Sequence, residues 1–104
     1  MNNGAYIYMD TYGEVVLMIY KKLEPPELQD ALPLTDTVGK THLCMHFVGG
    51  KDYVGASTEE DIERQILDYN MQNLQHTSVP ILGMSEKKFT RMKEFAERQL
   101  NIEL

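Results

Sequence analysis

Two of the three histidines and the only cysteine of this chain lie within five residues of one another. His42, Cys44 and His46 occupy every second position of the segment 41–48. Alternate side chains of a β-strand point to the same face, so a strand here would place both imidazoles and the thiol on one side. The other side would carry three apolar residues, Leu43, Met45 and Phe47.

A metal site is the first chemistry that these three residues suggest. Imidazole nitrogen and thiolate sulfur are ligands of zinc and copper, and alternate strand positions can direct two of them at one ion. A fourth ligand would be needed, for which His76 and Asp52 are candidates. Zinc sites with a strong sequence signature have paired ligand clusters, and this chain has one cluster. We therefore expect no metal and no cofactor, and we keep a metal site at His42, Cys44 and His46 as the alternative.

Nucleophilic catalysis by Cys44 is the second chemistry to consider. A reactive thiolate needs an orienting base and an electropositive or dipolar setting. A histidine two strand positions away lies about 6–7 Å from it at Cα, which permits contact. No glycine-bracketed nucleophile accompanies Cys44, and the acidic residues have the pattern of helix caps and solvated surface. We expect a non-enzymatic protein in which Cys44 packs like a small apolar residue.

Length, charge and cysteine content narrow the class of protein. A chain of 104 residues is typical of a single domain, here 1–104. A formal net charge of −6 disfavours direct nucleic-acid binding and docking on an anionic membrane. One cysteine cannot form an internal disulfide, and the N-terminus has no basic segment followed by an apolar stretch. We therefore expect a cytoplasmic protein without a membrane span.

The first half of the chain predicts a small antiparallel sheet. Alternation and turn residues predict about four strands, at 5–9, 14–20, 41–48 and 52–55. Gly13 closes the first hairpin, and the Gly49-Gly50 pair closes the last. The strand 14–20 is apolar on both faces in its run from Val15 to Tyr20, so we expect it to be central and covered on both sides.

The connection between the second and third strands has an unusual composition. Residues 21–40 contain three prolines, and the stretch between Glu24 and Asp36 holds four acids and no basic residue. Pro26 could start a short helical turn over 27–32. Connections of this length in a small domain are often functional, or they carry minor structure of their own.

The second half predicts two helices. Ser57 could cap the first, with Glu60 completing a capping box. Helical spacing gives this helix two apolar stripes on roughly opposite sides, one of Ile62, Ile66 and Tyr69 and the other of Leu67, Met71 and Leu74. A helix that is apolar on two sides is either sandwiched between layers or shared with a partner.

The last helix is expected from Glu86 to about Leu100, with Ser85 as its cap, after a linker or short strand marked by Pro80 and Gly83. Its first turns are basic, through Lys87, Lys88, Arg91 and Lys93. Positive charge at a helix start opposes the helix dipole. We expect these cations to pair with the acidic first helix, with an external anion as the alternative.

These features together predict an α+β fold, in which about four antiparallel strands from the N-terminal half carry two C-terminal helices. The function that we expect is occlusion of a macromolecule by a small acidic protein-binding module. Phage-encoded inhibitors of host defence, such as anti-CRISPR proteins, and immunity proteins share this size and composition.

The expected partner is a protein with a basic surface, and a homodimer is also compatible with the sequence. The alternative function is a small metal- or ligand-binding domain, catalytic or not, centred on the His42, Cys44 and His46 strand. The residues expected to bind the partner are Glu24, Glu27, Asp30, Asp36, Glu59, Glu60, Glu63, Leu67, Tyr69 and Met71.

Overall fold

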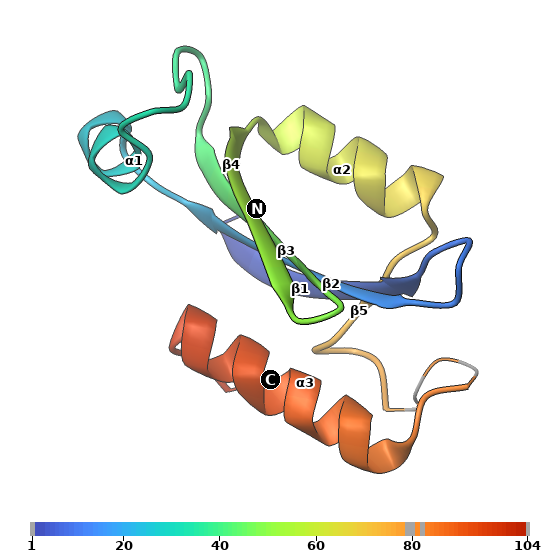
Figure 1. The fold of residues 1–104 in the computed structure, drawn as a ribbon. Helices are drawn as coiled ribbons and strands as arrows, with labels where there is room; N and C mark the ends of the chain where they lie inside the picture. The colour runs from blue at the N-terminus through green and yellow to red at the C-terminus, as the bar shows by residue number, and fades with distance from the viewer. Residues whose placement is uncertain (1, 79–80, 82, 104) are drawn as a thin grey trace.

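The structure is a computed structural model that describes residues 2–78, 81 and 83–103. Within these residues, three helices and five strands follow one another (Figure 1). Their order is β1 (Asn3–Met9), β2 (Val15–Lys22), α1 (Pro25–Ala31), β3 (His42–Val48), β4 (Lys51–Ser57), α2 (Glu59–Asp68), β5 (Gln72–Asn73) and α3 (Glu86–Leu100). The predicted α+β fold is confirmed. Pro80, expected in a linker or short strand, lies outside the described residues.

The strands form one antiparallel sheet in the order β4-β3-β2-β1-β5. The first four are the predicted strands, each paired with its neighbour in sequence. The fifth strand, β5, has only two residues, which pair with Tyr6 and Ile7 of β1. Sequence patterning did not predict β5, because two residues are too few for strand alternation to be recognised.

Local turn chemistry sets the two hairpins. Asp10 accepts hydrogen bonds through Oδ1 from the backbone N–H groups of Tyr12 and Glu14, at 2.9 and 2.8 Å. These bonds fix the turn between β1 and β2. Gly49 and Gly50 both have positive φ, which a two-residue turn of the primed type requires. Val48 therefore lies opposite Lys51, and the β3–β4 register follows.

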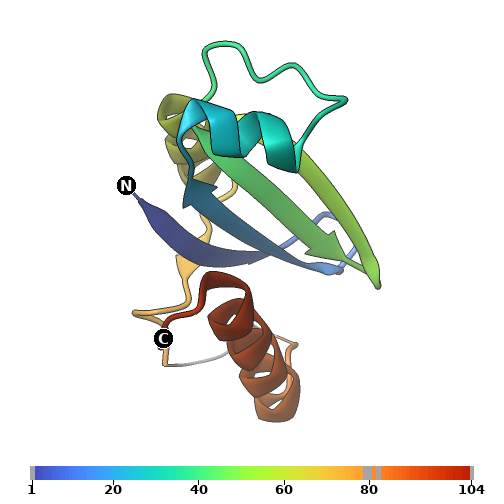
Figure 2. The ribbon, with the colours of Figure 1, turned by 90° about the vertical axis from the view of Figure 1, so that its left-hand side faces the viewer.

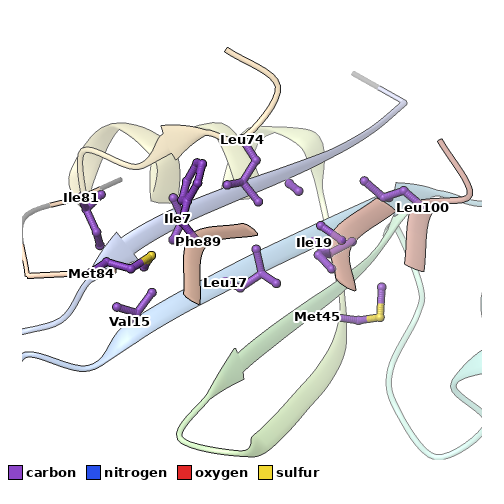
Figure 3. Packing of buried hydrophobic residues seen from close by; sticks show 12 residues of the cluster. Ile7, Val15, Leu17, Ile19, Met45, Leu74, Ile81, Met84, Phe89 and Leu100 are labelled. Carbon is purple, nitrogen blue, oxygen red and sulfur yellow. The ribbon is translucent and has the colours of Figure 1, made fainter. Parts of the chain in front are cut away.

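Each face of the sheet is covered by one long helix, as two perpendicular views show (Figures 1 and 2). The strand β2 is buried on both faces from Val15 to Tyr20, so the prediction that it is central is confirmed. On one face, Leu17 and Ile19 pack with Phe89 and Leu100 of α3. Figure 3 shows these side chains converging between the sheet and α3. No helix of the described residues is long and apolar enough to cross a membrane.

The opposite face packs against α2. A second apolar cluster there joins the sheet residues Met18, Tyr20 and Cys44 to Ile62 of α2 and to Met71. Ile62 is fully buried. The sheet therefore separates two cores, and the alternation of β2 assigns its side chains to one or the other.

The structure corrects two expectations about α2. Its N-cap is Thr58, whose side chain accepts a hydrogen bond from the Asp61 N–H at 3.1 Å. Ser57 is not the cap, because it is still paired with His42 at the end of β4. The helix also ends at Asp68, before two of the three residues of its expected second stripe.

Replacing Thr58 by alanine is expected to lower the free energy of unfolding by about 1 kcal/mol, since it removes the acceptor of the Asp61 N–H. Ser57→Ala is the matched control. The Ser57 hydroxyl makes only a 3.5 Å contact with the Thr58 carbonyl. Urea denaturation of both variants measures the difference. A larger loss in Ser57→Ala than in Thr58→Ala would contradict this assignment of the cap.

The other two helices begin as their sequences suggest. Ser85 caps α3 by accepting from the Lys88 N–H at 3.1 Å, as predicted. The helix α1 begins at Pro25, one residue before the predicted start at Pro26, and its N-cap Glu24 forms a capping box with Glu27. Leu28 is the buried residue of α1, so this short helix is held to the domain by one apolar anchor.

Candidate functional site

The predicted common face of the His/Cys strand is confirmed. His42, Cys44 and His46 lie on the α2 side of β3, and each has its own surroundings. A hydrogen bond of 3.0 Å joins His46 Nε2 to Gln65 Oε1 of α2. His42 is buried, with its Nδ1 2.7 Å from Thr41 Oγ1. Its ring stands edge-on to Tyr20, at 6.1 Å between centroids.

These residues do not form a metal centre in the described part of the chain. Residues 2–78, 81 and 83–103 contain no group of three or more His, Cys, Asp or Glu side chains that could hold an ion. Neither proposed fourth ligand completes the set. Asp52 pairs with Phe47, on the α3 side of the sheet, and His76 is exposed beyond β5.

Cys44 is placed as a core residue. Burial raises the pKa of its thiol from the ordinary 9.0 to about 11, and its side chain belongs to the apolar cluster under α2. A catalytic cysteine requires the opposite shift, because the thiolate is the nucleophile. The chemistry of this face therefore favours packing over catalysis.

The loop between α1 and β3, residues 32–41, carries two highly exposed apolar side chains. Leu34 is 100% exposed and Val38 is 83% exposed. The loop has defined turns around them. The Thr35 N–H donates to the Leu32 carbonyl at 3.2 Å, and the Val38 N–H donates to Asp36 Oδ1 at 3.0 Å. The two apolar side chains therefore project from a loop whose backbone forms hydrogen-bonded turns.

The four acids predicted to bind a partner are all exposed, three of them on α1 or at its N-cap and one in this loop. Glu24 and Glu27 form the α1 capping box, and Asp36 holds the turn at Val38. Asp30 lies on α1 without such a structural bond. The four carboxylates therefore lie on the loop and the helix that leads into it. We use the name acidic loop surface for these four acids together with the two exposed apolar residues of the loop: Glu24, Glu27, Asp30, Leu34, Asp36 and Val38.

The α2 residues expected to bind the same partner do not form one patch. Glu59, Glu60 and Glu63 are exposed, and α2 starts at the end of the sheet where β2 leads into α1. Leu67 is 79% exposed, but it lies near the other end of α2. Tyr69 follows it and stacks on Tyr8, at 4.9 Å between centroids.

Met71 was expected on the partner surface, and this expectation is wrong. Met71 follows the end of α2 and is buried in the cluster beneath the helix. Leu74, its companion on the expected second stripe, is fully buried on the other side of the sheet with α3. Of that stripe, Leu67 alone remains exposed on the helix.

A groove beside α3 is the second candidate site, and the sequence did not predict it. It has a volume of about 500 Å³ and lies between α3, the β3–β4 turn and the start of β2. Its apolar lining comes from both the sheet and α3, through Val15, Leu17, Phe47, Met92 and Phe95. Phe47 and Phe95 meet edge to face, with centroids 4.8 Å apart. We call this cavity the α3 groove.

The basic start of α3 has no internal partner of the predicted kind. Among the described residues, an ion pair joins Arg64 to Asp61 within α2, and none joins these four cations to α2. The expected pairing of Lys87, Lys88, Arg91 and Lys93 with α2 is therefore wrong. The reason is topological, because the sheet lies between α2 and α3 (Figure 1).

Comparisons with known proteins identify no relative. No protein-family model matches the chain, and neither a curated protein nor a solved structure matches it. The function has to be inferred from the geometry and chemistry of the chain itself.

Proposed function

We propose that this chain is a non-enzymatic protein-binding module that occludes a basic surface of a protein partner with its acidic loop surface. The observation that carries the proposal is the full exposure of Leu34 on a loop with defined turns. Apolar side chains that contact their own domain so little are available as anchors for a partner pocket. Val38, 83% exposed four residues later, supplies a second anchor.

The surrounding charges indicate the chemistry of the partner. Glu24, Glu27, Asp30 and Asp36 are exposed on α1, at its N-cap and on the loop that carries the two anchors, and the whole chain carries a net charge of −6. Acidic groups near the anchors steer a basic partner into place and contribute mainly to the association rate. The exposed acids Glu60 and Glu63 extend the negative charge at this end of the sheet, where positive groups including Lys22 lower the pKa of Glu59.

The His/Cys face supports a non-enzymatic reading. Cys44 is buried with a raised thiol pKa, and the His46 imidazole is engaged with Gln65. By size and composition, small inhibitors such as anti-CRISPR and immunity proteins are the functional class that we propose. The metal- or ligand-binding alternative at His42, Cys44 and His46 has no supporting cluster among the described residues.

The anchors are tested by the double variant Leu34→Ser/Val38→Ser. We expect unchanged stability, within about 0.5 kcal/mol, because neither side chain is buried. We expect capture of the specific partner from a lysate of the source cells to fall by about tenfold or more, since hot-spot anchors dominate binding energy. Quantitative mass spectrometry of the captured proteins provides the measurement.

Tyr12→Ser is the matched control for this experiment. Tyr12 is 91% exposed and lies in the β1–β2 turn, at the end of the sheet opposite the acidic loop surface. Its loss should leave capture unchanged. If both variants capture the same protein as the wild type does, the acidic loop surface is not the binding site.

The charges are tested by amide substitutions, because Lys would destroy the α1 capping box and the Asp36 turn. The set Glu24→Gln, Glu27→Gln, Asp30→Asn and Asp36→Asn removes four charges and keeps the acceptor oxygens. We expect slower association with the captured partner and a weaker dependence on salt. An unchanged salt dependence of the association rate would argue against a basic partner surface.

A further inference from the structure

The α3 groove combines an apolar interior with unpaired cations at its edge. Lys88 and Arg91 of α3 line it and are exposed. They are three residues apart, so they lie on neighbouring positions of one helix face. Lys51 approaches from the β3–β4 turn. In the described part of the chain, none of these three cations forms an ion pair.

The sheet side of the groove carries two acids. Glu14, before β2, and Asp52, on β4, also line the cavity, so Lys88 and Arg91 of α3 face two carboxylates and Lys51, the first residue of β4. No ion pair within 4.0 Å joins these groups across the groove in the described residues. The α3 side of the groove is therefore basic, the sheet side carries two carboxylates and one cation, and the lining between them is apolar.

We propose that the α3 groove binds a small monocarboxylic acid with an apolar body. Its volume of about 500 Å³ falls within the range of pockets that enclose small molecules, about 300–1,000 Å³. The apolar body would contact Leu17, Phe47 and Phe95, and the carboxylate would meet Arg91 and Lys88. A guanidinium binds a carboxylate through two parallel hydrogen bonds, which favours this head group.

The acids of the sheet side limit the ligand to one carboxylate. A second carboxylate at the other end of the ligand would lie near Glu14 or Asp52 and be repelled. The proposal is independent of the acidic loop surface. The groove lies at the β3–β4 turn, whereas the loop joins α1 to the opposite end of β3.

Three eight-carbon probes test the proposal: octanoate, octanol and octylammonium. They share the apolar body and differ in the charge of the head group. We expect saturable binding of octanoate that is about tenfold tighter than binding of either other probe. The reason is that only the carboxylate of octanoate can form a charge-assisted contact of opposite charges with Arg91 or Lys88. Backbone amide chemical shifts should change at Phe47, Gly49 and Phe95. Calorimetry gives the affinities.

Two charge-matched variants of α3 locate the head group. In Lys88→Gln/Arg91→Gln, the preference for octanoate should disappear while the spectrum of the folded protein is retained, because both side chains are exposed. Lys87→Gln/Lys93→Gln removes the same charge from residues that do not line the groove, and it should keep the preference. Equal affinities for the three probes, shifts outside the groove, or a preference lost in both variants would overturn the proposal.

Discussion

Replacing Ile62 by alanine is expected to destabilise the fold by about 2–5 kcal/mol, the range for deleting a large buried aliphatic side chain. Ile62 is the fully buried residue of α2, and it packs against Met18, Tyr20 and Cys44. Its loss would leave a cavity between the helix and the sheet. Urea denaturation followed by circular dichroism measures the change.

Leu67→Ala is the control on the same helix. Leu67 is 79% exposed, so its truncation should change stability by no more than about 0.5 kcal/mol. The comparison also tests the structure of α2 against the two-stripe pattern of the sequence. Comparable losses in the two variants would show that α2 buries both sides, contrary to the packing described above.

The thiol of Cys44 is expected to react with a disulfide reagent at least about tenfold more slowly in the native protein than in the unfolded one. Burial raises the Cys44 pKa from 9.0 to about 11, which lowers the thiolate fraction about a hundredfold, and the greater nucleophilicity of the more basic thiolate offsets about tenfold of this. Exclusion of the reagent from the core would slow the reaction further. Because Cys44 is the only cysteine of the chain, no other thiol contributes to the measured rate.

Ile62→Ala provides the matched comparison for thiol reactivity. The cavity beneath α2 adjoins Cys44, so this variant should react faster in its folded state than the wild type does. A wild-type native rate close to the unfolded rate would mean that Cys44 is accessible and ionised. That result would favour a nucleophilic role for Cys44 or a metal site at His42, Cys44 and His46.

The same thiol makes stability fall at alkaline pH. The Cys44 pKa is higher in the folded state, so the protonated thiol contributes fully to the free energy of unfolding below about pH 9, and this contribution is lost as the pH rises towards 11. Between about pH 8 and pH 10.5, the loss in the free energy of unfolding is about 2 kcal/mol. Cys44→Ala should lack this loss. Tyr8 and Tyr20, whose phenol pKa values burial also raises, are present in both proteins, so the difference isolates Cys44.

Much of the fold was predictable because its patterns are local. The alternation of β3 assigned Cys44 and Met45 to opposite cores, and the doubly apolar run of β2 identified the central strand. The start and end of α3 follow from Ser85 and from an amphipathic pattern that ends at Leu100. Each of these inferences needs only residues that are near one another in sequence.

The predictions of the α2 cap and of its second apolar stripe were wrong because tertiary contacts, and not local sequence, decide between two similar local structures. Ser57 and Thr58 can both cap a helix, and the pairing of Ser57 with His42 leaves the role to Thr58. Leu67, Met71 and Leu74 have helical spacing, but the chain leaves the helix after Asp68 and passes the edge of the sheet. Periodicity cannot reveal that turn.

The candidate surfaces were predictable only in part. The acids of the α1–β3 connection are visible in the sequence, whereas the exposure of Leu34 and Val38 depends on where the loop runs. The α3 groove joins the β3–β4 turn to a helix some 40 residues later, so no local pattern predicts it. The expected pairing of the α3 cations failed for the same reason.

The sheet order has a consequence for how the chain folds. The strands β1 to β4 pair in sequence order, and the hairpins β1–β2 and β3–β4 each close a short loop that can form early. In contrast, β5 returns to β1, where Asn73 meets Tyr6 across a separation of 67 residues. We expect this closure to be the last step of folding and the first to open, so the amides of β5 should exchange with solvent faster than those of β2.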